Sequence, residues 1–113
     1  MTQRTDQYSE QITHELAEIF ARDFEFPHHA FVTITRVHTT PDLKNSDIYI
    51  SVLPAQHTDE VIGVLAKSAK HLKNQLAHSI NARTVPNLLF KEDVAEAHAN
   101  KIEKILSELN EQN

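Results

Sequence analysis

Hydrophobic positions recur along the chain with two different periods, and these predict its secondary structure. Apolar residues three and four positions apart predict amphipathic helices over Gln3–Asp23, from Thr58 to just before Val85 and Pro86, and over residues 94–109. Segments rich in β-branched residues predict strands over residues 31–38, 47–53 and 87–91. The second helix is long for so small a chain, which predicts a kink near Ser68 and Ala69.

The order of these elements predicts one α+β domain over residues 1–113, arranged α-β-β-α-β-α. The first two strands are joined by a short polar connection, which favours an antiparallel pair. The third strand follows a helix and can therefore add to the sheet parallel to one neighbour. We expect a two-layer fold in which one face of a three-stranded sheet is buried under the helices.

Composition excludes several functional classes. A single glycine excludes the Gly-rich loops that cradle phosphate groups, and the absence of cysteine excludes disulfides and thiolate chemistry. The eight histidines are scattered, with no helical i, i+4 pair and no HExxH motif, so we predict no metal or cofactor site. No serine lies in a nucleophile motif, so we predict no enzymatic activity. The polar opening residues and the lack of cysteine predict a cytoplasmic protein.

Charge is distributed unevenly along the chain. The formal net charge is −5, yet residues 61–91 contain no acid and five bases: Lys67, Lys70, Lys73, Arg83 and Lys91. All sixteen acids and the other six bases lie outside that segment. A segment of one sign of charge in an acidic chain indicates a face that binds a polyanion.

Candidate RNA contacts lie mainly on the second helix, where spacings of three and four form a polar stripe. The stripe consists of Lys67, Lys70, His71, Asn74 and His78. The candidate contacts on this helix are Lys67, Lys70, His71, Lys73 and Asn74. Arg83 at its end could bind a phosphate or only neutralise the helix carboxyl terminus. Arg36 and Lys44, near the connection of the first two strands, could add phosphate contacts. The alternative is that the stripe is an ordinary solvated helix face.

Aromatic residues give little support to base stacking. They make up 6% of the chain, and we expect Phe31 and Phe90 to lie in the core beneath the sheet. Recognition should therefore depend on backbone charge and shape more than on bases. Pro41, Asp42 and Leu43 are expected to form a turn.

Three segments in order resemble the ribosome-binding factor A family. The first is a strand-loop-strand signature with TITRV at 33–37, PDL at 41–43 and IYISV at 48–52. The second is SAKHLKNQL at 68–76, and the third is RTVPNLLF at 83–90 followed by Asp93. The resemblance extends from about residue 4 to about residue 109. Each segment alone is weak, but the three at these spacings are fairly specific.

The resemblance implies a type II KH-like fold with a kinked second helix. It also implies a non-enzymatic ribosome biogenesis factor, most important in the cold, that binds RNA. The expected partners are the immature 30S small ribosomal subunit and its 16S rRNA. The expected role is to assist late maturation of that subunit and 16S rRNA processing.

Two positions depart from the family pattern. The family replaces the KH Gly-x-x-Gly loop by an Ala-x-Gly kink, but Lys70 stands at the position of that glycine. Lysine resists the positive φ that glycine permits, so we expect a milder kink. Lys73 stands where the family has arginine, which keeps the charge but loses the bidentate fork. The alternative function is an acidic protein-binding adaptor without direct RNA contact, and we expect a monomer in either case.

Overall fold

The structure is a computed structural model that describes residues 3–80 and 85–95 of the 113-residue chain. Its elements are α1 (Gln3–Asp23), β1 (Phe31–Thr39), β2 (Asn45–Leu53), α2 (Thr58–Ile80) and β3 (Asn87–Glu92), with short 3₁₀ turns η1 (Pro27–His29) and η2 (Ala55–His57). Helix α1 covers the predicted residues, and α2 begins at Thr58 as predicted. The predicted end of the second helix, just before Val85 and Pro86, falls on residues 81–84, which lie outside the described residues. The strands are one or two residues longer. Of the predicted closing helix, residues 94–95 are helical and the rest lies outside the described residues, as does Arg83.

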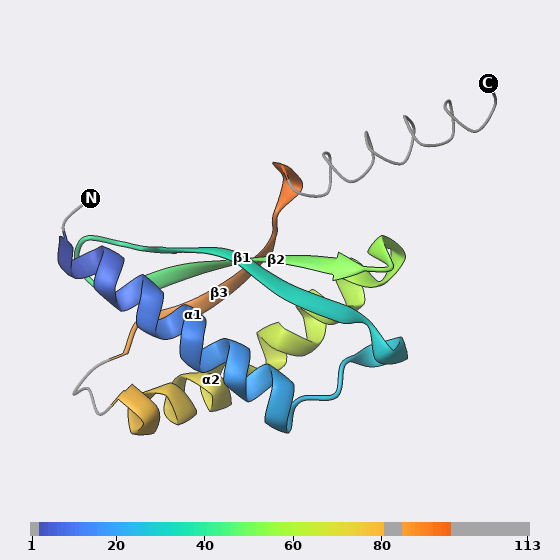
Figure 1. Ribbon diagram of the computed structural model, residues 1–113, viewed down its shortest axis with the longest axis horizontal. Coiled ribbons are helices and arrows are strands. Elements are labelled where there is room, and N and C mark those ends of the chain that lie inside the picture. The colour runs from blue at the N-terminus through green and yellow to red at the C-terminus, as the bar shows by residue number, and fades with distance from the viewer. Residues whose placement is uncertain (1–2, 81–84, 96–113) are drawn as a thin grey trace.

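The three strands form one sheet in the order β1-β2-β3, with β1 antiparallel and β3 parallel to β2. Figure 1 shows α1 and α2 together on one side of this sheet. Both predicted pairings are confirmed, because the turn between β1 and β2 is tight and α2 provides the crossover to β3. The result is the predicted two-layer α+β arrangement.

The core lies between the helices and the sheet. Its most buried side chains are Ile12, Leu16 and Ile19 of α1, Ile48 and Ile50 of β2, and Val61, Leu65, Leu72 and Leu76 of α2. Burying each of these contributes roughly 1.5–3 kcal/mol relative to leaving it exposed. The spacing of the α2 residues fixes which side of that helix faces the sheet. Helical backbone continues through Ser68 and Lys70 without a break, so the predicted kink does not interrupt α2.

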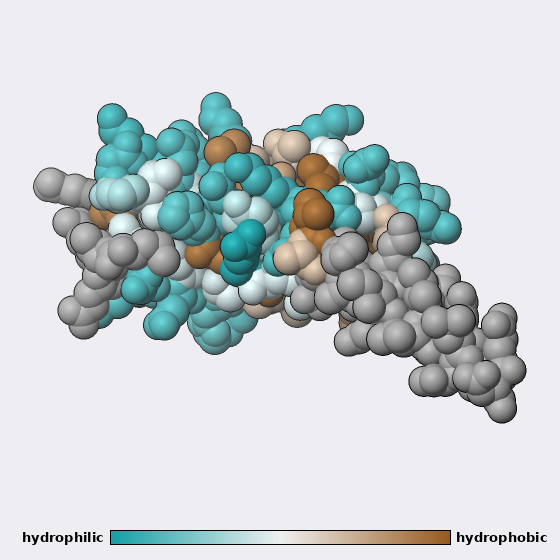
Figure 2. Space-filling model, turned by 90° about the horizontal axis from the view of Figure 1, so that it is seen from above, coloured by the Kyte–Doolittle hydropathy of each residue, from teal (hydrophilic) through white to brown (hydrophobic). Residues whose placement is uncertain are grey.

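The prediction that Phe31 lies in the core is wrong. Its side chain is 77% exposed, and it pairs across the strands with Leu53, which is 55% exposed. Side chains alternate along a strand, and Val32 and Ile34 pack against the core. Phe31 must therefore point to the other face of the sheet, whereas Phe90 packs against the core as predicted. Figure 2 views the sheet from the side away from the helices and shows separate hydrophobic spots among hydrophilic surface.

A β-bulge ties β1 to the end of β3. The pairing of β1 with β2 shifts between Ile34 and Arg36, which leaves Thr35 as the extra residue. The Thr35 hydroxyl donates a 2.6 Å hydrogen bond to Oδ2 of Asp93, whose backbone N–H donates to the Ile50 carbonyl at 2.9 Å. Asp93 is only 7% exposed, so its carboxylate depends on such donors. The bulge thus places the hydroxyl where the buried carboxylate needs it.

We expect Thr35→Val to lower the free energy of unfolding by about 1–3 kcal/mol, because it removes a donor from a buried carboxylate. Urea denaturation would measure the change. Thr33→Val, which alters an exposed hydroxyl of the same strand, serves as the control and should change stability much less. Equal stability of the two variants would contradict this account of the bulge.

Candidate nucleic-acid interface

The outer side of α2 is a polar surface that is free of acids beyond its first turn. Asp59 and Glu60 open the helix, and no acid follows as far as Ile80. The predicted stripe is exposed throughout; its members are Lys67, Lys70, His71, Asn74 and His78. It lies opposite Leu65, Leu72 and Leu76, which are fully buried. The predicted orientation of the stripe toward solvent is confirmed.

Lys73 lies at the edge of this surface and is held by a neutral partner. Its Nζ donates to Oδ1 of Asn87 at 2.8 Å. The backbone N–H of Asn87 in turn donates to the carbonyl of Lys44 at 2.8 Å. Asn87 therefore joins α2 to the turn between β1 and β2, and brings Lys44 and Lys73 to the same end of the molecule. No local sequence motif marks Asn87, because its role comes from the crossover that brings β3 beside β2.

The turn that carries Lys44 is built around Asp42. Oδ1 of Asp42 accepts hydrogen bonds from the Thr40 hydroxyl at 2.6 Å and from the Lys44 backbone N–H at 3.0 Å. Leu43 takes a left-handed conformation with φ of 61°. The hydrogen bond from Thr40, followed by that from Lys44, lowers the pKa of the Asp42 carboxyl group from its ordinary value. The predicted turn is confirmed, and it fixes the backbone from which Lys44 projects.

We expect the pKa of Asp42, followed by NMR across an acid titration, to rise in Thr40→Val toward its ordinary value. Because the folded pKa is lowered, the charged carboxylate stabilises the turn above the unfolded pKa. That contribution is lost as pH falls through the lowered folded pKa. The control Thr33→Val should leave the pKa of Asp42 unchanged. An unchanged pKa in Thr40→Val would show that the hydroxyl is not the main cause.

Arg36 does not join the surface on α2. Its guanidinium carbon lies 4.0 Å from the centre of the Tyr49 ring, and its Nε lies 3.9 Å from Oδ2 of Asp93. Tyr49 stands between Ile48 and Ile50, which are both buried against the helices. Since neighbouring strand residues point to opposite faces, Tyr49 and Arg36 lie on the other face of the sheet.

Lys91 shows that the acid-free segment does not form one face. Its register partner is Tyr49, and its Nζ lies 3.2 Å from Oδ1 of Asp47. It belongs with Arg36 on the far side of the sheet, and a carboxylate offsets its charge. The expectation that residues 61–91 form a single basic surface is therefore too broad. Lys91 lies in β3 on the far face of the sheet, whereas the exposed bases of the helical part lie on the outer side of α2.

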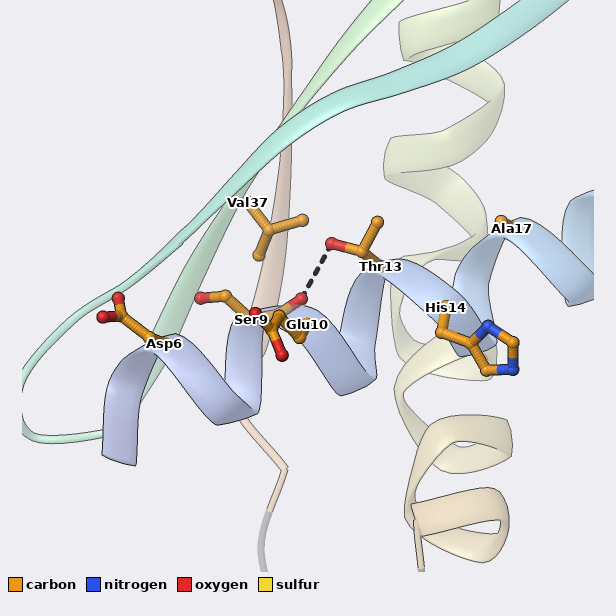
Figure 3. A pocket seen from close by; sticks show the side chains of 7 residues that line it. All are labelled: Asp6, Ser9, Glu10, Thr13, His14, Ala17 and Val37. Atoms are coloured by element: carbon orange, nitrogen blue, oxygen red, sulfur yellow. Dashed lines mark hydrogen bonds between the residues drawn. The ribbon is translucent and has the colours of Figure 1, made fainter. Parts of the chain in front are cut away.

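The neighbouring helix α1 carries an acidic flank. A shallow hollow of about 670 Å³ between α1 and β1 is lined by Asp6, Ser9, Glu10, Thr13, His14, Ala17 and Val37. Figure 3 shows Asp6, Glu10 and His14 projecting from α1, with Val37 of β1 beside the helix and a hydrogen bond from Thr13 Oγ1 to the Ser9 carbonyl. Nε2 of His14 lies 3.2 Å from Oε1 of Glu18. This hollow offers carboxylates and is unsuited to a polyanion.

The structure thus defines a class: a small two-layer α+β domain that presents one basic helix surface and one acidic flank. Within the described residues no helix has the length and apolar character needed to cross a bilayer. The chain belongs to the ribosome-binding factor A family, whose family model matches residues 4–106.

Curated relatives agree with this membership. The ribosome-binding factor A of Desulforamulus reducens is 36% identical over 113 residues, covering 99% of this chain and 94% of the relative. That of Macrococcus caseolyticus is 35% identical over 111 residues, covering 97% of each chain. Both alignments include α2 and the turn carrying Lys44.

Solved structures share the fold at lower identity. The crystal structure of ribosome-binding factor A from Thermus thermophilus has a TM-score of 0.57 and 17% identity, covering 78% of this chain and 90% of that one. A solution structure of a ribosome-binding factor A from Thermotoga maritima has a TM-score of 0.58 and 22% identity, covering 79% and 82%. These similarities confirm the fold class.

Proposed function

We propose that this protein binds the immature 30S ribosomal subunit and its 16S rRNA through the outer face of α2. In this role it assists late maturation of the subunit and 16S rRNA processing, as a non-enzymatic cytoplasmic factor most needed in the cold. The observation that carries the proposal is the acid-free exposed surface of α2. Family membership adds support, and a homology model of the Thermus thermophilus protein has been fitted into a map of its 30S complex.

The charges on this surface are available to a ligand. Within the described residues, Lys67 and Lys70 have no acidic partner, and they lie one helical turn apart. Lys73 donates to the uncharged Asn87 and so keeps its full charge. The hydrogen bond from the Asn87 backbone N–H to the Lys44 carbonyl also places Lys44 near the same end of α2. Four bases at one side of the molecule can each displace a counterion from an RNA backbone.

The contacts are proposed to be with phosphates and sugars more than with bases. Beyond its first turn, α2 exposes ammonium, imidazole and amide groups, and it contains no Phe, Tyr or Trp ring. The exposed ring of Phe31 lies on the far face of the sheet. Lysine acts as a flexible point charge without the fixed fork of arginine, which suits recognition of an RNA surface by charge and shape.

Arg36 and Arg83 are proposed only as secondary contacts with the RNA. Arg36 already stacks on Tyr49, and its side of the sheet differs from that of α2. Arg83 follows α2 in the chain and lies outside the described residues. His71 and Asn74 remain proposed contacts. Both are exposed, and both lie on the same face of α2 as Lys67 and Lys70.

We expect Lys67→Glu combined with Lys70→Glu to fold normally and to lose cosedimentation with 30S subunits in a sucrose gradient. Both side chains are exposed, so the change reverses surface charge without disturbing the core. Arg22→Glu combined with Lys91→Glu is the matched control, because it changes net charge equally at exposed positions away from the α2 stripe. It should still cosediment with the subunits.

Cosedimentation of the α2 variant at the level of the unaltered protein would contradict the proposed surface. Loss of binding in the control alone would indicate that the subunit contacts a different surface of the protein, around Arg22 or Lys91. The adaptor alternative predicts that partner binding survives nuclease treatment and depends on the acidic flank around Asp6 and Glu10.

A further inference from the structure

Two histidines and a glutamate from separate segments meet at the end of the molecule where α2 begins. They are His28 of η1, His57 of η2 and Glu60 in the first turn of α2. Nε2 of His28 lies 2.9 Å from Oε2 of Glu60, and the two imidazole rings stack with their centres 4.2 Å apart. One ligand atom from each of the three residues lies within 4.8 Å of the other two. No local sequence motif signals this cluster, because His28 lies 32 residues before Glu60 in the chain and reaches it only through the fold.

The loop that presents His28 is held in an unusual conformation. His28 has φ of 57° and ψ of 23°, and His29 has φ of 54°, both in the left-handed region. Such positions cost of order 1–3 kcal/mol each and tend to cluster at ligand clamps. Backbone hydrogen bonds from His29 to the Phe26 carbonyl and from Ala30 to the Pro27 carbonyl keep the turn closed. The His28 ring is therefore presented by a fixed turn and not by a freely moving loop.

We propose that His28, His57 and Glu60 bind a divalent transition-metal ion, with Zn²⁺ as the ion to test. Two imidazole nitrogens and one carboxylate oxygen form a ligand set that suits Zn²⁺ and not Ca²⁺ or Mg²⁺, which prefer oxygen. The fourth tetrahedral position would be open to water. This site lies apart from the lysines of α2, and it goes beyond the proposed RNA-binding function.

Binding requires only a small adjustment of side chains. Ligand atoms around a tetrahedral zinc ion lie about 3.3 Å apart. Nε2 of His28 and Oε2 of Glu60, at 2.9 Å, need only separate slightly, and any other pair of ligand atoms must close by no more than about 1.5 Å. The His57 ring must also turn out of the stack so that its lone pair points toward the ion. All three side chains retain access to solvent, which leaves room for that rotation. The bound ion would join the loop after α1 to the start of α2.

The test uses the full, untagged chain after removal of metal with a chelator. Titration with ZnCl₂ against a chromophoric competitor should give one saturable ion per chain. His57→Ala and Glu60→Gln should each weaken that binding at least tenfold. His14→Ala is the control and should bind as the unaltered chain does, because His14 belongs to the other described His and carboxylate cluster, with Glu15 and Glu18.

A second measurement needs no variant. Imidazole ¹⁵N resonances followed by NMR during the titration should shift at His28 and His57 and stay in place at His71 and His78. The proposal is overturned by the absence of saturable binding, by binding in His57→Ala equal to that of the unaltered chain, or by shifts confined to other histidines. It is equally overturned if His14→Ala, and not His57→Ala, abolishes the binding.

Discussion

Burial of one stripe of α2 against the sheet is the constraint from which the rest of the structure follows. Val61, Leu65, Leu72 and Leu76 are fully buried, and together they contribute on the order of 6–12 kcal/mol. Rotating the helix by even a quarter turn would expose part of this stripe. The same burial therefore fixes which side chains face solvent, and it is this fixed outer side that carries Lys67 and Lys70. The proposed RNA surface is the reverse side of the core.

The crossover through α2 also brings Lys44 close to the basic surface of that helix. Because α2 returns the chain to pair β3 parallel to β2, Asn87 arrives beside the turn between β1 and β2. Its side chain then reaches Lys73 while its backbone binds the carbonyl of Lys44. Two bases that are far apart in sequence are thus brought to one end by the topology. The acids of the flank lie on the neighbouring helix α1 and not on the outer side of α2, so the protein can be acidic in total and still present a basic surface.

Periodicity predicted the helices and strands well because burial acts on every third or fourth residue of α2 and on alternate residues of β2. Phe31 was assigned to the core because its side chain is apolar, although alternation with Val32 and Ile34 places it on the opposite face of the strand. Charge counted along the chain grouped Lys91 with the lysines of α2. In the structure, Lys91 lies in β3 on the far face of the sheet, beside Asp47. Neither Asn87 nor the meeting of His28 with His57 has a local signal, because both depend on contacts between distant segments. The lysines of the stripe were predictable because they lie on one helix.

The salt dependence of binding to 16S rRNA shows whether the lysines of α2 contact RNA phosphates. If Lys44, Lys67, Lys70 and Lys73 each meet a phosphate, log K should fall with log salt at a slope of roughly −2.8 to −3.6. Affinity would then drop roughly 50- to 150-fold between about 50 and about 200 mM salt. Lys67→Gln combined with Lys70→Gln should reduce the magnitude of the slope by about 1.4–1.8. An unchanged slope in that variant would contradict the account, because the outer face of α2 would then make no contact with the RNA backbone.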